Sequence, residues 1–335
     1  MFRFAFRRYN LPFRHPVRTA HGVWAEREGL LLRLEDENGG VSFGEAAPIP
    51  WFGTETVDEA EEVCRSLGEY VTGEILTKIP ARFVCLRFAL NAALSGRGED
   101  DFKDKKALPV AALLPAGRGA LEQVAAKAEA GFRTFKWKVG VADIADELSL
   151  LDDLIAKLPS GAKLRLDANG AWDRRRAERW LERCAERPVE FVEQPIAVEM
   201  KGAEDLLLGL AGDFPTPIAL DESVVSAGDV VRWLELGWPG VFVLKPTLMG
   251  DAAVIIARLQ SAKAPAVFSS ALETAVGAKA ALRMAFGFDG EPRALGFGVW
   301  PLFQDQRFDG PYLAPFIRPQ EVAAINEEAV WNALS

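Results

Sequence analysis

The sequence predicts an α/β protein in which a smaller α+β domain precedes a TIM-type barrel of alternating strands and helices. Three observations support this fold class. The 335 residues exceed the roughly 250 that a (β/α)8 barrel needs, so a barrel and a second domain both fit. Strands and helices alternate strictly from residue 107 onward, which favours a parallel sheet. Eight short apolar runs end near residues 115, 138, 167, 193, 221, 245, 269 and 299.

The first 100 residues are expected to form the α+β domain, because predicted strands come first and helices follow. A polar stretch at 97–106 is interpreted as a linker or exposed loop, and the tail over about 301–335 is predicted to pack back on this domain. The expected elements are strands at 2–10, 30–35 and within 40–53, then helices at 56–70 and 81–95.

The second part, residues 107–300, is expected to form the barrel. Its helices are amphipathic: in the segment 147–158, Leu148, Leu151 and Ile155 share one face. Asp173 and Asp251 stand where N-caps of two following helices are expected. Since no sequence repeat accompanies the alternation, a solenoid is not predicted.

Composition excludes several classes of function. The net charge is −9 with no basic run, which argues against nucleic acid or an anionic membrane as a partner. No segment has the length and apolar character of a membrane span or a secretion signal. The three cysteines, Cys64, Cys85 and Cys184, are far apart and are interpreted as buried thiols of a cytoplasmic protein. A small anionic substrate would need a local cation or lysine, and no oligomeric state is predicted.

Two lysines are the first residues along the chain for which a chemical role is predicted. Lys136 and Lys138 alternate with Phe135, Trp137 and Val139, so in a strand the lysines share one face. In a barrel the aromatic face would contact the helices and the lysines would enter the barrel mouth. The alternative is an edge strand with one solvated face, where lysines oppose aggregation.

Three carboxylates and a third lysine then follow at intervals of about 24–29 residues, each at the end of an apolar run: Asp167, Glu193, Asp221 and Lys245. The carboxyl ends of barrel strands meet at one rim, where barrel enzymes carry their catalytic groups. Converging carboxylates repel one another unless a cation joins them, and oxygen ligands suit Mg²⁺, with Mn²⁺ as a possible substitute. Each acid taken singly could instead cap a helix. Asn169 and Glu222 stand beside these ligands and are expected to support them.

The base is expected to be a lysine. The two histidines, His15 and His21, both lie in the first domain and are interpreted as structural. A lysine ordinarily has a pKa near 10.4, but crowding Lys136 against Lys138 should lower the pKa of one of them. Such a lysine can remove a proton α to a carboxylate, and a cation stabilises the resulting enediolate. Lys245 should lie across the barrel mouth from this pair.

These motifs together resemble the enolase superfamily, specifically its muconate-cycloisomerase-like branch. The resemblance covers nearly the whole chain and rests on FKWKVG, LRLDANGAW, FVEQP, IALDES, VLKPTLMG and SSALETAVG. It implies a (β/α)7β barrel with an N-terminal α+β capping domain. It also implies Lys138 as general base, Lys136 as its helper, and Lys245 as a cation facing the enolate. The implied metal ligands for Mg²⁺ are Asp167, Glu193 and Asp221.

Within the branch, the last two motifs resemble enzymes that dehydrate and aromatise a succinylated cyclohexadiene carboxylate for menaquinone biosynthesis. The alternatives are an N-succinylamino-acid racemase, a dipeptide epimerase and a muconate cycloisomerase. Dipeptide epimerases usually carry an Asp-x-Asp pair near the eighth strand, whereas residues 296–303 here read GFGVWPLF.

Substrate contacts are predicted less directly. Ser269, Ser270 and Glu273 follow the seventh strand and either contact the substrate or cap the next helix. The segments 18–24 and 50–54 are predicted to close over the site as a mobile lid, because the first shows no periodic pattern. Within these segments Trp24, Trp51 and Phe52 either form an apolar wall or serve packing.

Overall fold

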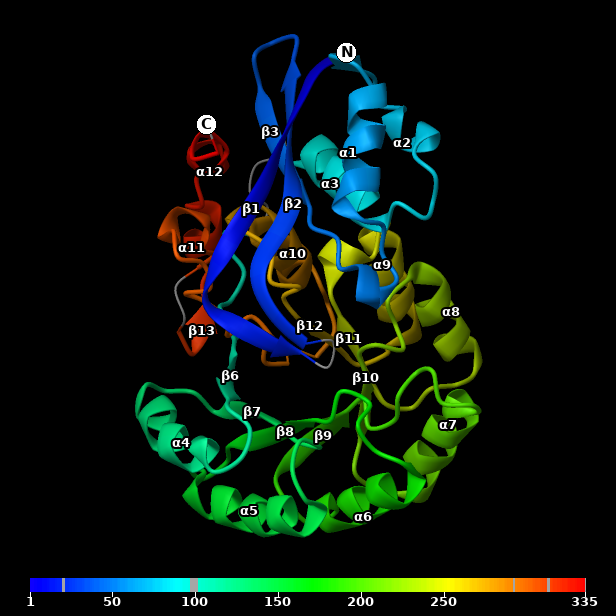
Figure 1. Ribbon diagram of the computed structural model, residues 1–335, viewed down its shortest axis with the longest axis vertical. Helices are drawn as coiled ribbons and strands as arrows, with labels where there is room; N and C mark the ends of the chain where they lie inside the picture. Colours follow the sequence, from blue (N-terminus) through cyan, green and yellow to red (C-terminus); the bar gives the residue numbers. More distant parts are fainter. Residues whose placement is uncertain (20–21, 97–101, 292, 312–313, 335) are drawn as a thin grey trace.

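The computed structural model describes residues 1–19, 22–96, 102–291, 293–311 and 314–334. It contains an antiparallel sheet with helices on one side and, below it, a curled parallel sheet surrounded by helices (Figure 1). His21 and residues 97–101 of the predicted linker lie outside the described residues.

The antiparallel sheet has four strands in the order β3-β2-β1-β4. Its first hairpin is longer than the sequence indicates, since strands were expected only at 2–10 and 30–35. Val17 pairs with Trp24 beyond an irregularity that follows Pro12, so the hairpin reaches the barrel (Figure 1). In the segment 18–24, which showed no periodic pattern, residues 18–19 and 22–24 are therefore paired strand, and residues 20–21 lie outside the described residues. The bounds are β1 Phe2–Thr19, β2 Gly22–Asp36, β3 Val41–Ala46 and β4 Tyr70–Val71.

Helix α1 (Val57–Ser66) lies between β3 and β4 in the chain, and α2 (Ile75–Lys78) and α3 (Val84–Ser95) follow β4. The α1 helix begins with a capping box, in which Thr56 and Glu59 satisfy each other's backbone N–H groups. Leu30, Leu32 and Leu34 alternate along β2 and are fully buried against these helices.

The parallel sheet has seven strands in sequence order, from β6 to β12. An eighth strand was expected to end near 299. Instead, Leu295 and Gly296 form single bridges to Val110 and Ser269, which adjoin the two edge strands, with Ala111 N–H donating to Leu295 O and Gly296 N–H to Phe268 O. This short segment closes the barrel by hydrogen bonds. The strands are β6 Ala111–Leu114, β7 Thr134–Lys138, β8 Lys163–Asp167, β9 Val189–Glu193, β10 Ile218–Leu220, β11 Val241–Leu244 and β12 Ala266–Phe268.

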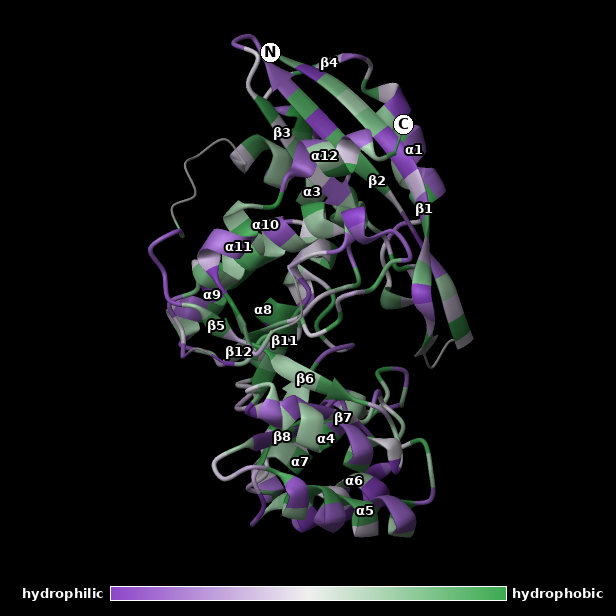
Figure 2. Cartoon of the chain, turned by 90° about the vertical axis from the view of Figure 1, so that its left-hand side faces the viewer, coloured by the Kyte–Doolittle hydropathy of each residue, from purple (hydrophilic) through white to green (hydrophobic). Residues whose placement is uncertain are grey.

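The barrel helices carry the amphipathic pattern that the sequence indicates, and α5 and α6 show both hydrophilic and hydrophobic colours in Figure 2. Asp173 caps α6 as predicted, accepting from Arg176 N. Asp251 also stands at the predicted N-cap position, of α9, but its carboxylate makes no cap bond and instead accepts from Arg87 and Asn91 of α3. The helices are α4 Gly119–Glu129, α5 Ile144–Lys157, α6 Arg174–Cys184, α7 Ala203–Asp213, α8 Ala227–Glu235, α9 Ala252–Ala262 and α10 Ala275–Phe286.

The tail contacts both parts of the chain. Strand β13 (Phe316–Ile317) pairs with β5 (Leu108–Pro109), and α11 (Pro319–Ala323) and α12 (Glu327–Asn332) follow. From β1, Arg7 donates to Trp331 O at 2.6 Å, while Lys279 of α10 donates to Ile325 O at 3.1 Å. Across the ranges described, no helix has the length and apolar character that crossing a bilayer requires. All three cysteines are buried and unbridged.

Candidate active site

The charged residues predicted from the strand ends lie at one rim of the barrel. Lys138 pairs in register with Asp167, and Asp167 with Glu193, across β7, β8 and β9. Asp221 and Lys245 each follow the last residue of their strands, β10 and β11. Parallel strands place their carboxyl ends at the same edge, so the side chains converge as expected.

The lysine pair faces into the barrel. β7 lies between β6 and β8, which excludes the edge-strand alternative. Phe135 and Trp137 are fully buried on the opposite face, where Trp137 packs edge-on against Trp180 of α6. Lys136 and Lys138 both line a cavity of about 910 Å³ above the strand ends.

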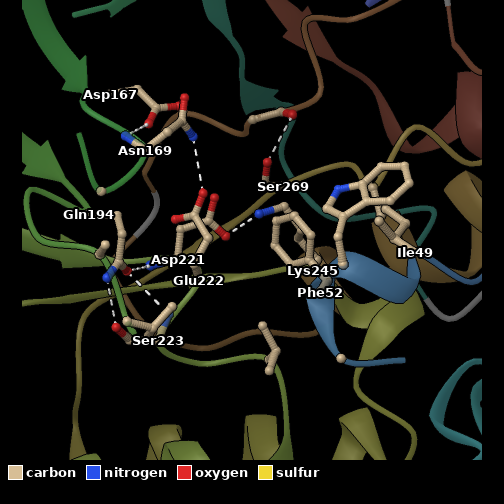
Figure 3. Close-up of a pocket in the computed structure, with 18 of the residues that line it drawn as sticks. Ile49, Phe52, Asp167, Asn169, Gln194, Asp221, Glu222, Ser223, Lys245 and Ser269 are labelled. Atoms are coloured by element: carbon tan, nitrogen blue, oxygen red, sulfur yellow. Dashed lines mark hydrogen bonds and ion pairs between the residues drawn. The ribbon is translucent and has the colours of Figure 1, made fainter. Parts of the chain in front are cut away.

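This cavity is walled by both parts of the chain. The barrel supplies the charged groups, including Asp167, Asp221 and Lys245, as Figure 3 shows. The N-terminal part supplies apolar and aromatic side chains: Ile49, Trp24, Trp51 and Phe52. Trp24 and Trp51 meet edge to face at 4.9 Å, and the Lys245 ammonium lies 4.7 Å from the Phe52 ring centroid. The aromatic residues of the two segments predicted to close over the site therefore do line it.

Two ammonium groups lie among the carboxylates. Lys136 Nζ is 2.8 Å from Asp167 Oδ2 and 2.7 Å from Glu193 Oε1. Lys245 Nζ is ion-paired with Asp221. Burial alone would lower the pKa of Lys136, but the charges of Asp167, Glu193 and Asp221 outweigh it and raise that pKa. The lowered pKa expected for one lysine of the pair is therefore not found at Lys136, because its ammonium faces carboxylates.

Glu193 is the most deeply buried of the three acids. Its side chain is 2% exposed, and burial, followed by the charge of Asp167, raises its pKa well above the ordinary value, against the lowering effect of Lys136. Three acids this close need positive charge between them. All their donor atoms are hard oxygens, which is the set that Mg²⁺ prefers.

In the part of the chain that the structure describes, no three His, Cys, Asp or Glu side chains are already grouped as metal ligands. The lysine ammonium groups occupy the space between the acids instead. Donor type and strand position nevertheless fit a divalent cation, provided that Asp167, Glu193 and Asp221 turn from the lysines toward it.

Lys138 differs from the other two lysines. Its side chain lines the cavity, yet the described residues offer it no hydrogen bond or ion pair. His15, by contrast, is exposed and does not line the cavity, in agreement with a role outside the site.

The two supporting residues predicted from the sequence contact each other. Asn169 has a left-handed backbone (φ 43°) and its amide donates to Glu222 Oε1 at 3.1 Å, while its N–H donates to Asp167 Oδ1 at 3.2 Å. Burial and the neighbouring charge of Asp221 raise the pKa of Glu222 to about 7. Glu222 Oε2 is buried and has no hydrogen-bond partner among the described residues. Both side chains line the cavity (Figure 3).

Gln194 was not singled out from the sequence, although it stands in the FVEQP motif. Its side chain is fully buried, and its carbonyl oxygen accepts from the N–H groups of Asp221 at 3.0 Å and Ser223 at 3.2 Å. Its amide donates to Ser223 Oγ at 2.7 Å. Gln194 therefore holds the backbone that carries Asp221. The only available signal was a polar residue directly after a charged strand end.

The residues after β12 separate into two groups. Ser269 and Ser270 line the cavity, and Ser270 Oγ also accepts from Leu272 N at 2.9 Å. Glu273 is fully buried outside the cavity lining, and its Oε2 accepts from Ala271 N at 2.6 Å. The helix α10 that follows is capped by Thr274, whose side chain accepts from Val276 N.

A barrel whose successive strand ends carry lysines and carboxylates in this order defines an enolase-type site. In agreement, residues 119–314 match the family described as Enolase C-terminal domain-like. Residues 1–95 match the MenC N-terminal domain. The chain belongs to the enolase superfamily and, within it, to the MenC family.

Individual relatives are similar to this chain over most of its length. The chain is 44% identical over 303 residues to an o-succinylbenzoate synthase of Thermosynechococcus vestitus, covering 89% of this chain and 92% of the relative. It is 31% identical to the o-succinylbenzoate synthase of Yersinia enterocolitica, covering 83% and 84%. A crystal structure of o-succinylbenzoate synthase from Thermosynechococcus elongatus BP-1, complexed with Mg in its active site, superposes with a TM-score of 0.87 at 39% identity, covering 99% of both chains.

Proposed function

We propose that this chain is an o-succinylbenzoate synthase. It dehydrates 2-succinyl-6-hydroxy-2,4-cyclohexadiene-1-carboxylate to o-succinylbenzoate, a step of menaquinone biosynthesis. The observation that carries the proposal is the meeting of three lysines with Asp167 and Asp221 in one cavity, with Glu193 buried against Lys136, in a chain 44% identical to a relative of that name. We also propose that the N-terminal domain ends near residue 100 and that the barrel domain begins near residue 107.

Lys138 is assigned as the general base. Its side chain lines the cavity without a carboxylate partner among the described residues, so it is the lysine whose amine is free to approach the substrate proton. It removes the ring proton α to the substrate carboxylate. The ammonium so formed then gives a proton to the departing hydroxyl on the same face, and water leaves as the ring becomes aromatic.

Lys136 and Lys245 are assigned as permanent cations. Their ion pairs with the acids raise the pKa of both, although burial acts in the opposite sense. Charged ammonium groups on two sides of the cavity stabilise the negative charge that develops on the substrate carboxylate. The Lys245 ammonium also faces the ring of Phe52. It can contact the aromatic ring that forms in the substrate by the same cation–π attraction.

Asp167, Glu193 and Asp221 are assigned as ligands of a divalent cation, taken to be Mg²⁺ because the superposed synthase carries Mg. The same oxygen donors fit Mn²⁺. When bound, the cation supplies positive charge against the substrate carboxylate. Asn169, Glu222 and Gln194 hold the acids in place through the hydrogen bonds described above.

Ser269 and Ser270 are assigned to the succinyl or ring carboxylate, because both line the cavity. Glu273 is not assigned a substrate contact, since it lies outside the lining. A two-base racemase is less well supported than the synthase. Racemisation uses a neutral lysine on one face of the substrate and an ammonium on the other, an arrangement that Lys138 and Lys245 also offer, so the preference for the synthase rests on the similarity to synthases of that name.

The test is ultraviolet turnover of the cyclohexadiene by purified protein, with Mg²⁺ and with EDTA. We expect fast loss of diene absorbance that EDTA abolishes and Mg²⁺ restores. Absence of turnover in folded, Mg²⁺-loaded protein would overturn the proposal. In that case, deuterium exchange at the α-carbon of N-succinylamino acids and dipeptides would identify a racemase.

A further inference from the structure

Arg27 of β2 is a buried cation whose only contacts in the described residues are to uncharged groups. Its side chain is 1% exposed, and no carboxylate lies within ion-pair distance among those residues. Burying a guanidinium away from water is costly unless hydrogen bonds replace its hydration. Here backbone carbonyl groups do so, and they come from two distant parts of the chain.

One set of carbonyls belongs to the N-terminal part. Nη1 donates to Pro48 O at 2.8 Å and Nη2 to Ala47 O at 2.5 Å. These residues directly precede Ile49, Trp51 and Phe52, which line the cavity. The guanidinium also lies 5.1 Å from the ring centroid of Trp24, another lining residue.

The other set belongs to the barrel. Nε donates to Leu272 O at 3.2 Å, and Nη2 approaches Ala271 O at 3.4 Å. Both residues line the cavity directly after Ser269 and Ser270. Leu272 has a left-handed backbone (φ 61°), which is unfavourable for a branched side chain and persists only when its surroundings impose it. The bond from Arg27 is one of the contacts that impose it.

We propose that Arg27 is a positioning residue for the dehydration, because it fixes the loop 269–272 and the segment 47–53 against each other around the substrate. The expected effect of Arg27 on the kinetics rests on the proposed function. The expected ordering of the two segments by Arg27 does not. Arg27 itself does not line the cavity and touches no reacting atom.

The experiment compares Arg27→Lys and Arg27→Met with Arg165→Met. Arg165 is also 1% exposed and donates to a backbone carbonyl, Ala294 O at 2.7 Å; unlike Arg27 it also pairs with a carboxylate, Glu190 Oε2 at 2.7 Å, and it lies outside the cavity lining. It controls for the loss of a buried guanidinium. Hydrogen exchange by mass spectrometry reports on peptides covering 44–54 and 266–274, and steady-state kinetics report KM and kcat separately.

For Arg27→Met we expect exchange in both peptides to accelerate about tenfold or more, and KM for the cyclohexadiene to rise more than kcat falls. Arg27→Lys should retain part of the protection, because a lysine keeps the charge but reaches fewer carbonyls. Arg165→Met should leave both peptides protected and KM unchanged. Unchanged exchange in Arg27→Met would overturn the proposal whatever the substrate proves to be. Accelerated exchange with unchanged KM would overturn the kinetic part, while inactive wild-type protein would instead count against the proposed function.

Discussion

Lys136 and Lys138 stand two residues apart and both should be essential, yet the structure predicts a much larger loss of stability for Lys136→Met than for Lys138→Met. Lys136 joins Asp167 and Glu193 at 2.8 and 2.7 Å and is 17% exposed. Removing one partner of a buried ion pair costs about 3–5 kcal/mol, which the partial exposure reduces to about 2–4 kcal/mol here. Lys138 has no such partner in the described residues, so Lys138→Met should stay within about 1 kcal/mol of wild type.

The assay is urea unfolding of the wild type and both variants in EDTA and again in Mg²⁺. In EDTA, Lys136→Met leaves the acids without the cation that separates them, and its loss of stability is largest. Mg²⁺ should restore part of that loss, because a ligand that binds only the folded state stabilises it as its concentration exceeds Kd. The stabilisation by Mg²⁺ should therefore be larger in Lys136→Met than in wild type, while both variants fail to turn over substrate.

Equal destabilisation of the two variants in EDTA would refute this reasoning, since it would mean that the ion pairs of Lys136 contribute nothing. Near-normal turnover by Lys138→Met would remove it as the base. A Lys138 variant that still exchanges the substrate α proton with solvent would lead to the same conclusion.

Three further outcomes are expected. Asp167→Asn should weaken Mg²⁺ binding about tenfold or more, measured by calorimetry, and an unchanged affinity would remove Asp167 from the ligand set. Phe52→Leu should lower kcat about three- to tenfold through the lost contact with Lys245, and a change confined to KM would argue against that role. Burial and the charge of Glu45 raise the pKa of Glu273 from 4.5 to about 7. The folded state thus retains a proton that the unfolded chain releases, so wild-type stability falls as pH rises from about 4.5 to 7. Unfolding measurements at pH 4 and pH 8 give the difference in stability between Glu273→Gln and wild type. From pH 4 to pH 8 this difference should change by about 2–3 kcal/mol in favour of the variant, and a pH-independent difference would contradict the raised pKa of Glu273.

The charged rim could be predicted from sequence because it depends on local order. Each of Asp167, Glu193, Asp221 and Lys245 closes an apolar run, and parallel strands then bring the ends together whatever the loops do. The pKa direction of Lys136 could not be predicted in the same way. It depends on whether its ammonium turns toward Lys138 or toward the acids, and both arrangements are compatible with one strand pattern.

The long hairpin and the hydrogen-bond partners of Arg27 and Asp251 could not be predicted from sequence patterns either. Arg27 and Leu272 are 245 positions apart, and Arg87 and Asp251 are 164 apart. A strand period or a helix cap signal reports only on neighbours within a few residues. Asp251 stands at a cap position and satisfies the local pattern, but the nearby Arg87 and Asn91 compete successfully for its carboxylate.

Lys245 shows why the two parts of the chain act together in this site. Its ammonium is paired with Asp221 of the barrel on one side and lies 4.7 Å from the Phe52 ring on the other. The barrel therefore determines the charge of Lys245, while the N-terminal part determines how much water reaches it. Because a charge is screened less where water is excluded, the aromatic wall strengthens the same electrostatic stabilisation that the barrel lysines supply. Arg27 fits the same scheme, since its hydrogen bonds join the segment that precedes that wall to the loop after β12.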